Sequence, residues 1–379
     1  MLGNLFGAPN KETFVTSLLH AIRRAGDQRA IRFDRDRFCL VVDAEKGRLF
    51  LSPAYDEYVA AEGRERRGVI ERYVGLWLQG GESLTPDTFA EARANLLPRV
   101  RERVAFEQLR LGGTEVSFRL LSPDLGVELV YLLGDGSCLP LGNEHLDEWD
   151  VSFEEAFREA RANLAERSQV GFRSPQPGFF VWSGRDGFES ARLLLMERIV
   201  PLEVTGEPVA LVARCDMLAV TGSQDPPGLT RLVAMAQEAL GQSGLLCPAP
   251  VVWREGAWQP FMPQRHEGIR RLWLQTRLRD YQAQGAVLAE RFPDSRVASY
   301  QLARNRDDDT WVDHTAWDDE GEHLLPEAEY LALIREGQTL GLFRRERMVQ
   351  EGLLEPIEVF PVRYRAAGFP SPEQVSRLR

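Results

Sequence analysis

Short apolar runs that come in pairs, joined by tight polar turns, most constrain the fold of this chain. A turn of a few residues reverses the chain, so each pair predicts an antiparallel hairpin. Longer stretches with apolar residues every three or four positions separate the pairs and predict helices. The sequence therefore predicts an α+β protein with several small, mostly antiparallel sheets and flanking helices. The predicted strands are 30–33, 37–43, 48–51, 116–120, 127–133, 251–253, 257–261, 296–304 and 310–317.

The helical periodicity is clearest near the N-terminus. Phe14, Leu18 and Ile22 repeat at i+4, and Asn10 precedes them as an N-cap. Ser152, followed three residues later by Glu155, forms a capping box at another helix start. The predicted helices cover about 11–25, a segment opened by Ser52-Pro53, 85–103, 153–165, 187–200, a segment opened by Pro226, and 264–291. Pro98 is a potential break in the helix over 85–103.

The length of the chain predicts two or three domains, because 379 residues exceed what one small core needs. The character of the sequence changes near residue 263, where an arginine-rich amphipathic helix begins. The predicted domains are 1–147, 148–262 and 263–379.

The composition is that of a soluble globular protein, with 44% hydrophobic and 27% charged residues. A net charge of -11 argues against nucleic acid as a partner, since such binding needs a basic surface. We find neither a signal peptide nor an apolar run that would span a membrane. The cysteines, Cys39, Cys138, Cys215 and Cys247, form no C-x-x-C and read as reduced core residues. A cytoplasmic location is the expectation.

Nearly all basic residues are arginine, and the two lysines are Lys11 and Lys46. Neither lies in a glycine-rich strand-to-helix loop, so a phosphate-binding P-loop lysine is missing. A Schiff-base lysine in an apolar pocket is not expected either. We predict no cofactor.

The stretch Phe179–Leu194 carries the first candidate site, because an apolar strand runs into a glycine-bracketed turn and a predicted helix. Asp186 is placed as an N-cap, Glu189 can reach back to complete a capping box, and Arg192 can pair with Glu189 at i+3. This structural interpretation explains all three residues. The functional alternative is an anion or peptide-carboxylate site at the helix start.

Arg214 and Asp216 are the only charges in the apolar segment 208–220. In a hairpin they are turn residues, which we favour. In one continuous strand they would share a face, and a buried pair would be a site candidate.

The sequence contains no strong motif for a metal site or for a catalytic nucleophile. Asp307, Asp308 and Asp309 lie in an acidic stretch but lack the calcium-loop pattern, so no metal site is predicted. G-x-S-x-G and H-E-x-x-H are absent from the sequence, and no catalytic residue is assigned. Trp253 and Trp258 are expected to face each other across a hairpin.

The segment Glu91–Leu96 recurs without change as Glu159–Leu164. A duplicated helix-plus-strands unit and chance convergence of two alanine-rich helices both explain the repeat.

Residues 148–261 resemble the YtpQ-like family of bacterial proteins, a family of unknown function. Three stretches carry the resemblance: Trp149 with the helix holding Ala160, Asn163 and Leu164; the run 186–194; and the segment 209–220 with Asp216 and Leu218. Residues 29–78 are similar more weakly, in the order of strands and helix. The resemblance implies an α+β cytoplasmic protein and implies no reaction. The order of elements across 11–166 also resembles the type III secretion chaperone-like fold, whose members bind other polypeptides.

Two functions remain open from the sequence. The first is a non-catalytic adaptor or chaperone-like module that binds another protein, with Asp186, Glu189, Arg192, Arg214 and Asp216 as candidate binding residues. The second is a hydrolase-type enzyme in which the carboxylates Asp186, Glu189 and Asp216 converge with Arg192 in a cleft.

Overall fold

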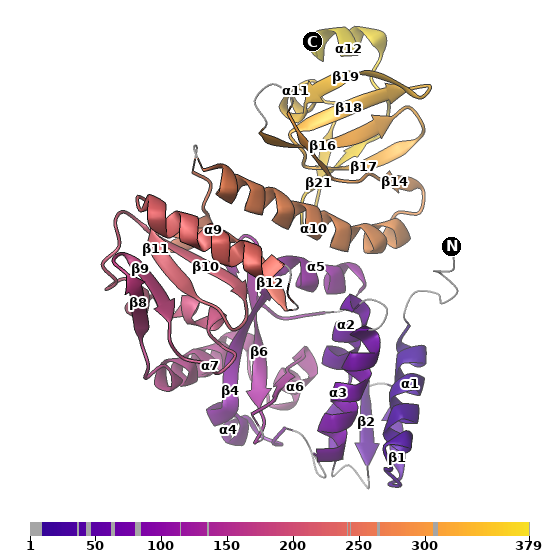
Figure 1. The fold of residues 1–379 in the computed structure, drawn as a ribbon. Coiled ribbons are helices and arrows are strands. Elements are labelled where there is room, and N and C mark those ends of the chain that lie inside the picture. The colour runs from indigo at the N-terminus through magenta and orange to yellow at the C-terminus, as the bar shows by residue number, and fades with distance from the viewer. Residues whose placement is uncertain are drawn as a thin grey trace. The chain divides into compact units, whose positions relative to one another are not determined.

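The computed structural model describes residues 10–35, 38–42, 47–61, 65–79, 85–113, 115–134, 136–240, 242, 244–263, 266–305 and 310–378. Small, mostly antiparallel sheets with flanking helices confirm the predicted α+β class (Figure 1). The chain divides into two compact units, and the three predicted domain ranges stay predictions. Unit 1 is Met1–Arg99, Glu115–Arg119 and Val127–Gln169, and unit 2 is Val100–Thr114, Leu120–Gly126 and Val170–Arg379.

Unit 1 begins with the predicted amphipathic helix, α1 (Lys11–Arg24). Asn10 caps it by accepting the N–H of Thr13 at 2.7 Å. Its stripe of Phe14, Leu18 and Ile22 is fully buried in the core of this unit, as the periodicity predicts. The elements that follow are β1 (Ile31–Asp34), β2 (Cys39–Val42) and β3 (Gly47–Phe50), which form one antiparallel sheet, then α2 (Ser52–Ala60) and α3 (Glu65–Gln79).

The prediction of a helix over 85–103 is wrong. Only α4 (Phe89–Ala92) and a single 3₁₀ turn, η1 (Arg93–Asn95), are helical there, and β4 (Leu96–Glu102) follows. Pro98 explains the outcome, because proline disfavours the helical conformation of the residue before it and cannot donate a helical hydrogen bond.

The next sheet has the order β4-β6-β5, with β7 paired to β6. The strand predicted at 116–120 begins later, since the N–H of Ser117 donates to the Asn143 side chain at 3.1 Å instead of joining a ladder. Ser152 caps its helix as predicted, accepting the N–H of Glu155 at 3.2 Å. The bounds are α5 (Arg103–Leu111), β5 (Arg119–Ser122), β6 (Leu125–Leu132), β7 (Cys138–Pro140), α6 (Asn143–Glu148) and α7 (Phe153–Arg167).

Unit 2 contains a six-stranded sheet of order β13-β12-β10-β11-β9-β8, with helix α9 packed against it (Figure 1). The predicted hairpin within 208–220 is confirmed by β10 and β11. Trp253 and Trp258 face each other across the next hairpin, with ring centroids 5.4 Å apart. The bounds are β8 (Phe172–Gln176), β9 (Phe179–Trp182), β10 (Pro208–Arg214), β11 (Ala219–Gly222), α9 (Pro226–Leu240), β12 (Leu245–Arg254) and β13 (Ala257–Pro260).

The single helix predicted over 187–200 is also wrong. The segment forms a 3₁₀ helix, η2 (Ser190–Leu194), and a short α8 (Met196–Ile199), separated at Leu195. Residues 190–193 are all buried, and so is Leu195. Leu195 has φ -99° and ψ 67°, outside the helical region, so it ends η2 before α8 begins.

The predicted amphipathic helix before the C-terminal sheets is present as α10 (Glu267–Arg291). The strand predicted over 296–304 is divided into two, because Tyr300 between them turns inward and stacks on Tyr281 at 4.9 Å. The elements are β14 (Ser295–Val297), β15 (Gln301–Arg304), β16 (Trp311–Asp318), β17 (Glu322–Pro326), β18 (Tyr330–Arg335), β19 (Gln338–Arg344), α11 (Arg345–Gln350), β20 (Glu355–Ile357), β21 (Arg363–Ala366) and α12 (Pro372–Leu378).

Two four-stranded sheets, β14-β17-β21-β20 and β15-β16-β18-β19, share an apolar core in which Trp317, Leu331 and Leu333 are fully buried. The pairs β14–β17 and β16–β18 are parallel, and the remaining pairs in these sheets are antiparallel. In the described part of the chain no helix has the length and apolar character to cross a bilayer.

Candidate functional site

Asp186 and Arg192 form the most specific contact among the residues singled out from the sequence. The buried Arg192 guanidinium donates two hydrogen bonds, from Nη1 to Oδ1 and from Nη2 to Oδ2 of Asp186, each at 2.7 Å. The predicted pairing of Arg192 with Glu189 is therefore replaced by a bidentate pair with Asp186, because the 3₁₀ winding changes the direction of the Arg192 side chain. Arg192 also lies over the Trp182 ring, 4.8 Å from its centroid.

Glu189 reaches back as predicted, and its Oε1 accepts the N–H of Asp186 at 2.9 Å. Asp186 accepts the N–H of Phe188 and pairs with Arg192, so its carboxylate stabilises the turn. Partial burial acts to raise the pKa of Asp186, but the hydrogen bonds and charge of Arg192 outweigh it and the pKa lies below its usual value. Burial raises the pKa of Glu189. Glu189 is only 2% exposed, and its Oε2 has no hydrogen-bond partner among the described protein atoms.

Arg214 and Asp216 lie in the turn after β10, as the hairpin interpretation predicts. Arg214 Nε donates to Asp216 Oδ1 at 2.8 Å, and the Asp216 side chain is about half exposed. The two turns meet through the backbone, because the N–H of Ser190 donates to the carbonyl of Cys215 at 3.0 Å. The structure thus gathers Asp186, Glu189 and Arg192, and keeps Arg214 with Asp216 as a separate surface pair.

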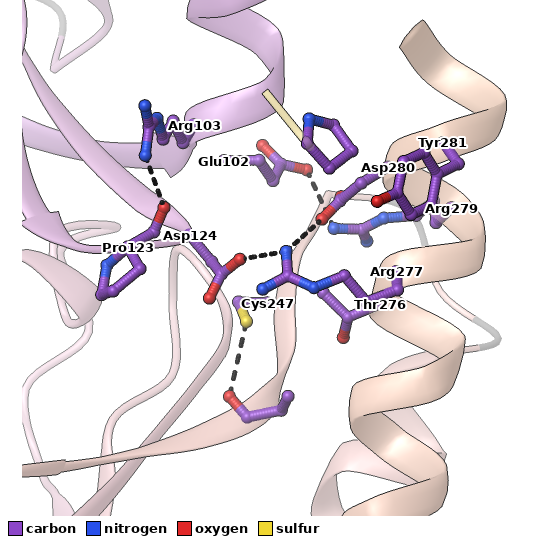
Figure 2. Close-up of polar contacts among 12 residues, drawn as sticks. Glu102, Arg103, Pro123, Asp124, Cys247, Thr276, Arg277, Arg279, Asp280 and Tyr281 are labelled. Carbon is purple, nitrogen blue, oxygen red and sulfur yellow. Dashed lines mark hydrogen bonds and ion pairs between the residues drawn. The ribbon is translucent and has the colours of Figure 1, made fainter. Parts of the chain in front are cut away.

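A second polar cluster in unit 2 was not predicted from the sequence. Figure 2 shows Arg277 of α10 between two carboxylates, with Nη1 2.5 Å from Asp124 Oδ1 and 3.7 Å from Asp280 Oδ2. Both carboxylates are buried. Asp280 shares the helix with Arg277 at i+3, which is a visible spacing, whereas Asp124 lies 153 residues away and gives no local signal.

Burial dominates the electrostatics of this cluster. It raises the pKa of Asp280 to about 7, against the attraction of Arg277 and Arg279. It also raises the pKa of the Cys247 thiol to about 12, so this cysteine is not an activated nucleophile. For Arg277, burial acts to lower the pKa, but the charges of Asp124 and Asp280 outweigh it. The cluster is an interior network that stabilises α10.

Beside this network lies a cavity of about 440 Å³, to which Arg277 contributes. Its charged groups already have partners: Glu329 pairs with Arg270 at 3.3 Å, and Glu327 with Arg345 at 3.5 Å. Its aromatic walls are fixed too, since Trp273 Nε1 donates to the Phe261 carbonyl at 2.9 Å. Tyr300 and Asp313 line the cavity and are hydrogen-bonded to each other, but burial raises the pKa of Tyr300, so this hydroxyl is not an activated nucleophile.

A groove of about 460 Å³ follows β19 in the C-terminal part of unit 2. We call it the β19 groove. Leu342 is 55% exposed within it. The charged residues lining it, among those the structure describes, are Arg344 and Arg347. The lining consists of Tyr330, Leu340, Gly341, Leu342, Phe343, Arg344, Arg347 and Leu378.

Unit 1 has a larger groove, of about 650 Å³, between α1 and α3. Two of its arginines are engaged within the unit. Arg67 pairs with Glu71 at 2.7 Å, and Arg66 donates to the Ala61 carbonyl at 2.9 Å. It presents no open strand, which sets it apart from the β19 groove.

Within the described ranges, no group of three or more His, Cys, Asp or Glu side chains could hold a metal ion. Asp307, Asp308 and Asp309 lie outside those ranges. The four cysteines, all among the described residues, are not joined in disulfides, and Cys39 and Cys247 are buried.

Comparisons with protein-family models, with the curated proteins and with the solved structures found no match to this chain. The resemblance to the YtpQ-like family therefore stays a prediction, and functional proposals depend on the geometry.

Proposed function

We propose that this chain is a cytoplasmic, non-catalytic protein that binds another protein, as an adaptor or chaperone-like module, and that the partner docks in the β19 groove. The observation that carries the proposal is an edge strand with an exposed apolar side chain, Leu342, flanked by Arg344 and Arg347. An edge strand of this kind is a template for pairing with another chain.

The charge of the groove supports the same proposal. The chain carries a net charge of -11, yet arginines supply the charge along this groove. Arginine beside exposed apolar side chains is enriched at protein interfaces. Arg192 and Arg277 are each bonded to a carboxylate within the fold, so these two guanidinium groups offer less to a partner.

Affinity capture from the native host with three forms of the chain tests the proposal. The Leu342→Glu variant places a carboxylate in the groove. Val200→Glu is the matched control, because Val200 is 63% exposed and lies outside the groove lining. We expect a near-stoichiometric partner with the wild type and with Val200→Glu, and its loss with Leu342→Glu. Equal recovery by all three forms would contradict docking in this groove.

A hydrolase-type enzyme that uses Asp186, Glu189 and Asp216 with Arg192 is the second candidate. One observation favours it, because the environments of Asp186 and Glu189 move their pKa values in opposite directions, as in acid–base pairs. However, Arg192 is occupied by Asp186 and Asp216 lies in an exposed turn. Screening hydrolysis with the wild type and Glu189→Gln separates the candidates: activity that the substitution abolishes in a folded protein would support the enzyme.

A further inference from the structure

We infer, building on the proposed function, that the partner contributes an extended acidic segment that pairs with β19 as an additional strand of the sheet β15-β16-β18-β19. This inference names both the chemistry of the partner and the backbone atoms that receive it. Its support comes from the register of β19, from the side chains in the groove and from the charge of the groove.

The register shows which backbone groups of β19 face outward. β18 and β19 are antiparallel, with Tyr330 opposite Arg344 and Ala332 opposite Leu342. The N–H of Arg345 donates to the Glu329 carbonyl at 3.0 Å, so this pair is a hydrogen-bonded pair. Only alternate pairs of an antiparallel ladder are hydrogen-bonded. The N–H and C=O groups of Leu342 and Arg344 therefore point away from β18, toward the open edge.

The sheet order leaves that edge unpaired among the described strands, because β19 is the last strand of its sheet. The edge is also short. The ladder register shifts between Leu333 and Ile334, and α11 begins at Arg345, so regular pairing is confined to the end of β19. A partner segment of roughly four to six residues matches this length.

The side chains indicate the composition of that segment. Leu342 offers an apolar contact. Arg344 lies over the Tyr330 ring at 5.6 Å, and Arg347 donates to the Leu378 carbonyl at 3.1 Å, so both arginines are held in the groove. Side chains alternate between the two faces of a strand. Leu342 and Arg344 are two residues apart, so their side chains share one face of β19, and Phe343 lies on the other face. A segment that alternates carboxylate and apolar residues places its carboxylates on the face of Arg344 and its apolar residues on the face of Phe343, whereas a basic segment is repelled.

Fluorescence polarisation with defined peptides tests the inference on the full-length protein. The probe is a labelled seven-residue peptide of alternating Glu and Val, and the control alternates Lys and Val. We expect the acidic peptide to bind at least about tenfold more tightly, with an advantage that shrinks as salt screens the arginines. Equal binding of the two peptides would overturn the charge assignment.

N-methylation of the peptide separates strand pairing from simple ionic attraction. One peptide carries N-methyl groups on one alternate set of amides, and its matched partner carries them on the other set. Because only one set faces β19, we expect one peptide to lose about tenfold or more in affinity while the other binds as the unmodified peptide does. Equal affinity of the two methylated peptides would overturn the strand-pairing model.

Reversing the charge of an arginine in the groove tests the charge assignment from the side of the protein. Arg344→Glu is expected to invert the preference toward the Lys–Val peptide, while Val200→Glu leaves it unchanged. If Leu342→Glu abolishes capture of the native partner but the peptides show neither charge nor register dependence, docking in the groove stands and the acidic strand is refuted. If Leu342→Glu leaves capture intact, the proposed function fails as well.

Discussion

Asp280→Asn is the substitution whose effect follows most directly from the structure. Asp280 is 3% exposed on α10, with its Oδ2 3.7 Å from Arg277, which is already bonded to Asp124. Burial raises the pKa of Asp280 from 3.8 to about 7. Asparagine has nearly the same shape and no charge, so it imitates the protonated aspartic acid.

The sign and size of the effect follow from the two pKa values. Between pH 3.8 and about 7, the folded state keeps a proton on Asp280 that the unfolded state has released. Retention of this proton stabilises the folded state. This contribution to the free energy of unfolding is complete below pH 3.8 and is lost as the pH rises through 7. Each pH unit corresponds to at most ~1.4 kcal/mol, and the window spans roughly three units, so the ceiling is ~4 kcal/mol. The variant should match the wild type near pH 4 and exceed its stability at pH 8 by up to this amount.

Urea unfolding at pH 4.5, 6 and 8 measures the difference in the free energy of unfolding between Asp280→Asn and the wild type. Hydrogen exchange of α10 peptides, with exchange times corrected for pH, is an alternative measurement. Other titrating groups cancel in that difference. Asp294→Asn is the matched control for the loss of one carboxylate, since Asp294 is exposed just beyond the end of α10. A difference between Asp280→Asn and wild type that stays constant with pH would refute the reasoning.

Three further substitutions test other parts of the structure. Asp186→Ala leaves the buried Arg192 without its carboxylate and should cost ~2–3 kcal/mol in urea unfolding, whereas Asp216→Ala, in an exposed pair, should cost under ~1 kcal/mol. Burial lowers the pKa of His145 from 6.5 to about 3, so stability should fall as the pH drops below 6.5, and His145→Gln should remove that slope in acid denaturation. Arg363→Leu leaves buried acceptors unpaired and should cost more than ~3 kcal/mol, read from the thermal midpoint. Wild-type midpoints for Asp186→Ala or Arg363→Leu, or an unchanged acid slope for His145→Gln, would contradict the respective contact.

Local patterns predicted the elements whose stabilising contacts are local. The stripe of α1, the cap at Ser152 and the hairpin of Trp253 and Trp258 all depend on residues a few positions apart. Arg192 shows where such patterns fail. The i+3 rule assigned it to Glu189 on an ideal α-helix, but the segment winds as a 3₁₀ helix and Arg192 pairs with Asp186.

The repeated six-residue segment shows the same limit more sharply. Its second copy, Glu159–Leu164, lies within α7, and its first copy, Glu91–Leu96, passes from α4 through η1 into β4. The sequence after each copy decides the outcome, because Pro98 follows only the first. The copies also contact each other, since Asn163 Nδ2 donates to the Leu96 carbonyl at 2.9 Å. Identical residues therefore adopt different conformations here.

The network around Arg277 could not be predicted in its full extent. The spacing of Arg277 and Asp280 on one helix is visible in the sequence, but Asp124 joins them only through tertiary packing. The β19 groove is hidden for a similar reason. Leu342 lies in an ordinary hairpin pattern, and only the order of strands in the sheet makes β19 an edge.

Amide exchange along β19 tests the central claim most directly, because the account assigns each backbone N–H a direction. In the free protein, the N–H groups of Leu342 and Arg344 should exchange fast, while those of Gly341 and Phe343 should be protected by β18. Addition of the acidic peptide should slow exchange at Leu342 and Arg344 specifically. Unchanged exchange at these two amides in the bound state, or protection of them already in the free protein, would contradict docking at the edge of β19.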